Sequence, residues 1–218
     1  EKPDMVIVYG DTNTTVAGAL AAAKLKIPVA HIEAGIRQKP KDMPEEINRV
    51  VTDHMSSLLF CCSELSSQNL KQENITKGVF ISGDIMYDLF LRMKPHFLKE
   101  KMLHDFNLQE GKYTLITLHR DFNVDNKENL VSILEGLKGF TEETKLSVIF
   151  PMHPRTRNRI EEFNLTKYLT FMNIIPPVGY LELMGLLEGC TNVITDSGGL
   201  KKKAYFAEKQ AAVIMPDT

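Results

Sequence analysis

Short runs of β-branched and apolar residues alternate with helical patterns from one end of this chain to the other. Helical patterns occur, for example, at residues 14–25, 45–57, 64–73, 127–136 and 180–187, and most begin near Ser, Thr, Asp, Asn or Pro. Repeated strand–helix units of this kind build parallel sheets covered by helices. The sequence therefore predicts an α/β fold with strands at residues 5–9, 29–32, 58–62, 79–82, 114–118, 147–150, 169–172, 192–195 and 212–215.

Residues 84–112 have a mixed polar and apolar helical pattern with little β character, and they separate the first four expected strands from the last five. We therefore expect two Rossmann-like domains, at residues 1–94 and 113–218, joined by a linker at residues 95–112. Ligands of open parallel sheets bind at the carboxyl ends of the strands. With two such sheets, we expect the ligand in the cleft between the domains.

Composition excludes several classes of partner. The 218 residues include 26 basic and 28 acidic side chains, so the net charge of −2 offers no general attraction to nucleic acid or to an anionic membrane. The apolar stretches are shorter than the roughly 20 residues that a membrane span needs. Three cysteines without disulfide spacing are typical of the reducing cytoplasm, where we expect the protein.

Three acidic residues follow expected strands or open expected helices in the first half of the chain: Asp11, Glu33 and Glu45. Neighbouring parallel strands lie about 4.8 Å apart, so acids at successive strand ends can converge on one ligand and transfer protons. Simpler interpretations remain open, because Asp11 could cap its helix and Glu45 could complement a helix dipole. Glu33 is harder to explain in that way, since a charged side chain between an apolar strand and an Ala-Gly turn needs a partner.

In the second half, His119 and Arg120 follow one expected strand, and His153 follows the next. An imidazole beside a guanidinium suits a proton carrier next to an anion clamp. A lone histidine is more often structural, whereas two at matching strand ends favour a site. No set of His, Cys and Asp residues has zinc-ligand spacing, so we expect no metal.

Ser197, Gly198 and Gly199 lie between an expected strand and the helix that follows it. Glycines let backbone N–H groups approach a ligand, and a helix N-terminus favours an anion, so a diphosphate fits there. The alternative is an ordinary turn with a Ser N-cap. The absence of a complete G-x-G-x-x-G motif or of G-K-[ST] argues against a nicotinamide cofactor and against a P-loop.

Five motifs, taken in order, resemble the non-hydrolysing UDP-N-acetylglucosamine 2-epimerase family over nearly the whole chain. They are Tyr-Gly-Asp-Thr at 9–12, His-Ile-Glu-Ala-Gly-Ile-Arg at 31–37, Pro-Glu-Glu-Ile-Asn-Arg at 44–49, Leu-His-Arg at 118–120 and Thr-Asp-Ser-Gly-Gly at 195–199. The resemblance implies a glycosyltransferase-B-like pair of Rossmann domains that binds UDP-N-acetylhexosamine, a role in polysaccharide biosynthesis, and no nicotinamide or obligatory metal. We also expect a homodimer.

The resemblance further implies inversion at C2 of the sugar, by elimination of UDP to a 2-acetamidoglucal and its re-addition. The acid/base group would be Asp11, Glu33 and Glu45. His119 and Arg49 would assist binding or the charge of the leaving group. The UDP phosphates would be held by Ser197, Gly198 and Gly199, with Arg120 and His153 as further substrate-binding residues.

The chain also departs from the family pattern. Lys203 occupies the position of a family Glu, and the family's first strand–helix units and its C-terminal segment are not among these residues. We therefore expect both domains to be incomplete, and an inactive fragment is one interpretation. Two others are a non-catalytic nucleotide-sugar-binding protein and a glycosyltransferase of the same architecture, although Glu33 and Glu45 disfavour the latter because glycosyl transfer needs no proton exchange at C2.

Overall fold

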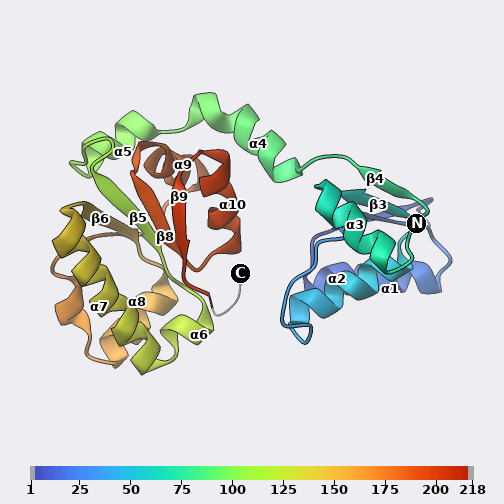
Figure 1. Cartoon of the computed structure of the whole chain (residues 1–218), viewed down its shortest axis with the longest axis horizontal. Coiled ribbons are helices and arrows are strands. Elements are labelled where there is room, and N and C mark those ends of the chain that lie inside the picture. The colour runs from blue at the N-terminus through green and yellow to red at the C-terminus, as the bar shows by residue number, and fades with distance from the viewer. Residues whose placement is uncertain (1–2, 216–218) are drawn as a thin grey trace. The chain divides into compact units, whose positions relative to one another are not determined.

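The structure is a computed structural model that describes residues 3–215 (Figure 1). Its contacts divide the chain into two compact units, the first ending at Asp88 and the second beginning at Leu89. Each unit contains one sheet in which all paired strands are parallel. The predicted α/β class with two parallel-sheet domains is confirmed.

The first unit is a four-stranded sheet in the order β1-β2-β3-β4, with a helix after each of the first three strands. Its elements are β1 (Val6–Tyr9), α1 (Asn13–Lys24), β2 (Val29–Ala34), α2 (Pro44–Met55), β3 (Leu58–Cys61), α3 (Glu64–Gln72) and β4 (Val79–Ile81), and α4 (Ile85–Met93) crosses the division between the units.

All three helices between these strands cover the same face of the first sheet. Val8, His31 and Leu59 are register partners on neighbouring strands, so their side chains share one face. Val8 packs against α1, His31 hydrogen-bonds to α2, and Leu59 packs against α3. This face holds two small apolar clusters and a group of buried polar side chains.

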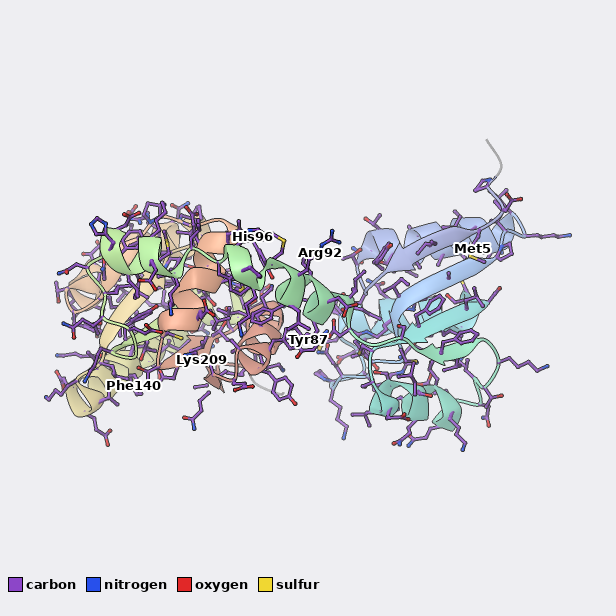
Figure 2. The ribbon with its side chains drawn as sticks, turned by 90° about the horizontal axis from the view of Figure 1, so that it is seen from above. Met5, Tyr87, Arg92, His96, Phe140 and Lys209 are labelled. Carbon is purple, nitrogen blue, oxygen red and sulfur yellow. The ribbon has the colours of Figure 1, made fainter. Side chains whose placement is uncertain are left out.

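The opposite face carries a second row of register partners, which are Tyr9, Ile32, Phe60 and Phe80. Tyr9 and Phe80 are 57% and 52% exposed, although strand side chains this large are normally packed. Met5, labelled in Figure 2, is also exposed. In the described part of this unit, one face of the sheet is therefore packed and the other presents apolar side chains to solvent.

The second unit has a five-stranded sheet in the order β7-β6-β5-β8-β9. Its elements are η1 (Lys94–His96), α5 (Lys99–Asp105), β5 (Tyr113–Thr117), α6 (Asp121–Val124), α7 (Lys127–Thr144), β6 (Ser147–Pro151), α8 (Pro154–Glu162), η2 (Thr166–Leu169), β7 (Asn173–Ile175), α9 (Tyr180–Gly189), β8 (Asn192–Thr195), α10 (Gly198–Phe206) and β9 (Gln210–Val213).

Helices cover both faces of this second sheet, as Figure 1 shows. One large apolar cluster joins the sheet to α5, α9 and α10, and the other joins it to α7 and α8. The chain runs from β5 to β6 on one side of β5 and from β8 to β9 on the other, so the strand order reverses between β5 and β8. Such a reversal opens a crevice at the carboxyl ends of the two strands, where ligands of these folds bind.

Three details differ from the expectations. Residues 84–112 do not form one helix but α4, η1 and α5, because Pro95 has no N–H to continue the ladder of α4. The strand expected at 169–172 begins at Asn173, since the preceding residues close the turn of η2. The strand expected at 212–215 lies two residues earlier, at Gln210–Val213. The domain boundaries given above stay a prediction.

None of the helices within residues 3–215 combines the length and the apolar character that a bilayer span requires.

Candidate active site

Asp11 lies in the turn between β1 and α1. The N-cap of α1 is Thr12, whose hydroxyl accepts a hydrogen bond from the backbone N–H of Thr15 at 3.3 Å. The carboxylate of Asp11 forms an ion pair with the guanidinium of Arg49 on α2. The interpretation of Asp11 as a helix cap is therefore wrong, and its carboxylate is held towards α2.

Glu33 is the extra residue of a β-bulge at the end of β2, where the register with β3 shifts between Ile32 and Ala34. Its φ of +70° lies in the left-handed region, which is uncommon for a residue other than glycine. One carboxylate oxygen of Glu33 lies 3.6 Å from the position that a Cβ on Gly10 would take. The bulge thus directs Glu33 to the same turn that carries Asp11.

Glu45 is half-buried in the first turn of α2, where a carboxylate complements the helix dipole. Its neighbour Glu46 is buried and accepts hydrogen bonds from Arg49 Nη1 and from the backbone N–H of Gln38, both at 2.9 Å. Arg49 is itself only 3% exposed and bridges Glu46 to Asp11. Its expected contact with substrate stays a prediction.

The expectations missed two of the buried charged residues on α2, Glu46 and Asp53. Together with Arg49 they follow the spacing i, i+3 and i+7, which places all three on one face of the helix. Charged residues at the spacing normally taken by the buried apolar face of a helix could have predicted this cluster from the sequence. This face supports the turn at the end of β1 and the bulge of β2.

In the second unit, Asp196 links the carboxyl ends of β5 and β8. It is fully buried and accepts hydrogen bonds from the backbone N–H groups of His119 at 2.9 Å and Arg120 at 2.8 Å, and from the side chain of Asn123 at 3.2 Å. The expectations quoted this aspartate in a motif but gave it no role. Its bonds join the carboxyl ends of the two strands at the point where the strand order reverses.

The imidazole of His119 lies beside Asp196, with 3.4 Å between Nδ1 and Oδ1. Burial lowers the pKa of His119, the nearby cations add to that effect, and Asp196 opposes it. The lowered pKa favours the neutral ring, which has one N–H to donate in a hydrogen bond. His153 is near, with 6.0 Å between the ring centres, and its Nδ1 caps α8 by accepting from the backbone N–H of Arg155.

Ser197, Gly198 and Gly199 form the N-terminus of α10. The hydroxyl of Ser197 caps the helix by accepting from the backbone N–H of Leu200 at 3.3 Å. A Cβ added to Gly198 would meet no atom within 4 Å, and one added to Gly199 would lie 3.7 Å from Nζ of Lys203. The cap is thus real, and the space over the glycines also suits an anion at a helix N-terminus.

Lys203 adds a positive charge to this end of α10. Burial lowers its pKa, and Lys202 adds to the effect. Its ammonium lies 5.8 Å from the centre of the Tyr180 ring. For metal ions, the described residues include no group of three or more His, Cys, Asp or Glu side chains arranged to hold one.

Comparison with known proteins places the chain in a family. The family model described as UDP-N-acetylglucosamine 2-epimerase matches residues 1–217. A UDP-N-acetylglucosamine 2-epimerase homolog from Methanococcus maripaludis is 46% identical over the whole chain. The UDP-2,3-diacetamido-2,3-dideoxy-D-glucuronate 2-epimerase of Pseudomonas aeruginosa is 43% identical, also over the whole chain.

Solved structures agree with these relatives. The crystal structure of Methanocaldococcus jannaschii UDP-GlcNAc 2-epimerase in complex with UDP-GlcNAc and UDP superposes on the whole chain with a TM-score of 0.88 and 45% identity, and 62% of that structure is covered. The chain spans 61% of the length of the Methanococcus maripaludis relative and 60% of that of the Pseudomonas aeruginosa relative. Because the family model matches almost every residue, the chain belongs to the UDP-N-acetylglucosamine 2-epimerase family.

Proposed function

We propose that this chain acts in the interconversion of UDP-GlcNAc and UDP-ManNAc, an isomerase reaction at C2 of the sugar. The observation that carries the proposal is a pair of half-buried carboxylates at one turn. Asp11 lies in this turn and pairs with Arg49, and the carboxylate of Glu33 reaches the neighbouring Gly10. Membership of the epimerase family supports the same reaction. A proton must leave C2 and return on the other face, so the reaction needs acid and base groups of this kind.

The chemistry balances without a redox partner. A carboxylate removes the C2 proton, the electron pair forms the C1–C2 double bond, and the C1–O bond to UDP breaks with its electrons on the diphosphate. The intermediate is a 2-acetamidoglucal. UDP then adds back to C1 while a carboxylic acid delivers a proton to the opposite face of C2. Asp11, Glu33 and Glu45 are the proposed acid/base group.

The second unit provides groups suited to the departing UDP. The N-terminus of α10 and the ammonium of Lys203 favour negative charge. A neutral His119 can donate a hydrogen bond to a diphosphate oxygen, and Arg120 follows it in the chain. Charge that develops on the leaving group is stabilised best by groups already held in place, as Asp196 holds the backbone of His119 and Arg120.

The test is incubation with UDP-GlcNAc in D2O, followed by NMR of the sugar. We expect deuterium at C2 and formation of UDP-ManNAc. Asp11→Asn or Glu45→Gln should abolish the exchange while UDP affinity stays within about threefold, because these groups act on C2 and not on UDP. Equal loss of UDP binding and exchange would make the two acids ligands only.

The same assay distinguishes the sugars. Since one relative at 43% identity is named for a 2,3-diacetamido uronate, the UDP-linked uronate is run beside UDP-GlcNAc. If exchange is faster with the UDP-linked uronate, that sugar would replace UDP-GlcNAc as the proposed substrate. UDP binding without exchange of either sugar would favour a nucleotide-sugar-binding protein.

A homodimer and a cytoplasmic location complete the proposal. Ile7 and Tyr9 of β1 share one face of the first sheet and are exposed, and an apolar surface of this kind suits a second copy of the chain. Light scattering should give twice the mass of the chain, and Ile7→Lys should shift it to a monomer. The free thiols of all three cysteines support a reducing compartment.

A further inference from the structure

His31 lies in the middle of β2 and is fully buried, yet both of its ring nitrogens have acceptors. Nε2 lies 2.8 Å from the carbonyl oxygen of Gly10, and Nδ1 lies 2.7 Å from Oδ1 of Asp53. A peptide carbonyl only accepts hydrogen bonds, so Nε2 carries a proton and donates it. The ring therefore links the last residue before Asp11 to helix α2.

Asp53 holds β2 on both sides of Glu33. One of its carboxylate oxygens accepts from His31, and the other accepts from the backbone N–H of Gly35 at 3.1 Å. That second oxygen also accepts from Arg37 Nη1 at 2.7 Å. The bulge and its left-handed residue are thus fixed between two hydrogen bonds to one buried carboxylate.

The guanidinium of Arg37 extends this network to the end of α3. Its Nε and Nη2 each donate to the carboxylate of Glu73 at 2.7 Å. A chain of hydrogen bonds therefore runs from Gly10 through His31, Asp53 and Arg37 to Glu73. Buried networks of this kind, when every member is satisfied, hold a single geometry.

We propose that His31 and Asp53 are positioning residues, which hold the Gly10–Asp11 peptide and the Glu33 bulge so that the two carboxylates keep one fixed separation. The inference rests on the proposed function for its catalytic consequence, but its structural part does not. His31 acts through Gly10 and Asp53 acts through the backbone around Glu33. Displacement of a reacting group by about 1 Å costs on the order of 100-fold in rate, so this support is needed for proton exchange.

Two substitutions at Asp53 separate the hydrogen bonds from the charge. Asp53→Ala removes the acceptor for His31, Gly35 and Arg37 together. Asp53→Asn can keep all three, because its NH2 group donates to Nδ1 of His31 while its oxygen accepts from Gly35 and Arg37. His54 is exposed and lies next to Asp53 on α2, so His54→Gln is the matched control.

The first measurement is NMR of the 218-residue chain and needs no activity. We expect the proton between Nδ1 of His31 and Asp53 to resonate far downfield. The amides of Gly10 and Gly35 should exchange slowly, since they donate to the carbonyl of Ile32 and to Asp53. In Asp53→Ala the ring signal should be lost and these amides should exchange about tenfold faster or more, whereas Asp53→Asn and His54→Gln should keep slow exchange. Unchanged amide exchange in Asp53→Ala overturns the proposal.

The second measurement is deuterium exchange at C2 of UDP-GlcNAc. Asp53→Ala should lower kcat about 100-fold with UDP affinity unchanged, and Asp53→Asn should recover most of the rate. If the unsubstituted chain shows no exchange, the proposed function fails while the NMR result still decides the role of His31 and Asp53. If it does exchange and Asp53→Ala is equally fast, the positioning role is wrong.

Discussion

The two units use the same strand–helix repeat but complete it differently. In the second unit the residues of β5, β6 and β8 are nearly all buried, because helices lie on both faces of the sheet. In the first unit burial alternates along β1, since α1, α2 and α3 cover the same face. The first sheet is packed on one face only, so it buries less apolar surface than the second sheet and gains less stability from it.

Buried polar groups occupy part of the space that apolar side chains fill in the second unit. The covered face of the first sheet holds His31, Glu46, Arg49 and Asp53 between its two small clusters. Such networks are costly to desolvate and contribute little net stability, but breaking one is strongly destabilising. The comparison teaches that the first unit depends on intact ion pairs, whereas the second depends on apolar packing.

The largest expected effect concerns Arg49, which bridges Asp11 and Glu46. Arg49→Met leaves two carboxylates without their shared cation, one of them buried, and should destabilise the first unit by about 3–5 kcal/mol. Amide hydrogen exchange in β2 and β3 measures this loss, and β5 and β8 should keep their protection. Arg92, labelled in Figure 2, is exposed, so Arg92→Met is the control. Equal effects of the two changes would contradict the difference between the units.

Gly198 tests binding in the second unit without touching its core. A side chain here meets no protein atom, so Gly198→Val should keep the fold and lower UDP affinity about 100-fold or more by filling the ligand's space. Gly139 of α7 has equally open surroundings, and Gly139→Val should leave UDP affinity unchanged. Calorimetry with UDP is the measurement. If Gly198→Val binds UDP normally, the N-terminus of α10 is an ordinary turn.

Ser197→Ala belongs to the same comparison and should act more weakly. It removes the N-cap of α10 and should cost about 1 kcal/mol of stability and less than tenfold in UDP affinity. A loss as large as that of Gly198→Val would mean that the hydroxyl, and not the backbone, carries the binding.

Glu33 and Lys145 both have positive φ, one at the bulge of the first unit and the other at the end of α7 in the second. Glycine relieves the strain that alanine keeps, so Glu33→Gly should be about 1 kcal/mol more stable than Glu33→Ala in denaturant unfolding. Both variants lose the carboxylate and should lose exchange at C2. Lys145→Gly should instead leave exchange intact. If both Glu33 variants retained exchange, Glu33 would not belong to the acid/base group.

Sequence periodicity predicted the fold well because parallel strands buried on two faces are continuous apolar runs. In the first unit this signal was misleading. Residues 6–9 read Val-Ile-Val-Tyr, a continuous apolar run, although one face of the strand is exposed. Asp11 and Glu33 were predicted to lie close together because the carboxyl ends of parallel strands meet at one edge. The bulge at Glu33 was not predicted. The backbone beside it is held by Asp53, which is 20 positions further along the chain than Glu33.

Asp196 shows the second limit of the sequence. Its partners are the backbone N–H groups of His119 and Arg120, which lie 77 and 76 residues away. A charged residue at a strand end can be a cap, a ligand or a support, and only the distant partner decides between these roles. Likewise, only the structure shows that Thr12, and not Asp11, caps α1.

The smallest expected effect is a pH dependence in the second unit. Burial holds the pKa of His119 below its ordinary value. The unfolded chain therefore binds a proton at this residue near pH 6.5, whereas the folded state binds it only at lower pH. Stability should therefore fall as pH is lowered from about 7.5 through 6.5, until the folded state is protonated as well. The groups around the ring are Asp196, Arg120, His153 and Arg155, and only Asp196 favours the charged form.

This effect should be small, because 38% of the His119 side chain is exposed and water screens its charge. Hydrogen exchange of the β5 and β8 amides in denaturant, measured between pH 5.5 and 7.5, gives the slope of the unfolding free energy against pH. His119→Gln should flatten it, whereas His104→Gln, at a side chain that is 91% exposed, should not. If the slope is unchanged in His119→Gln, another group causes the pH dependence. The stability data would then give no support for a neutral imidazole beside the proposed diphosphate site.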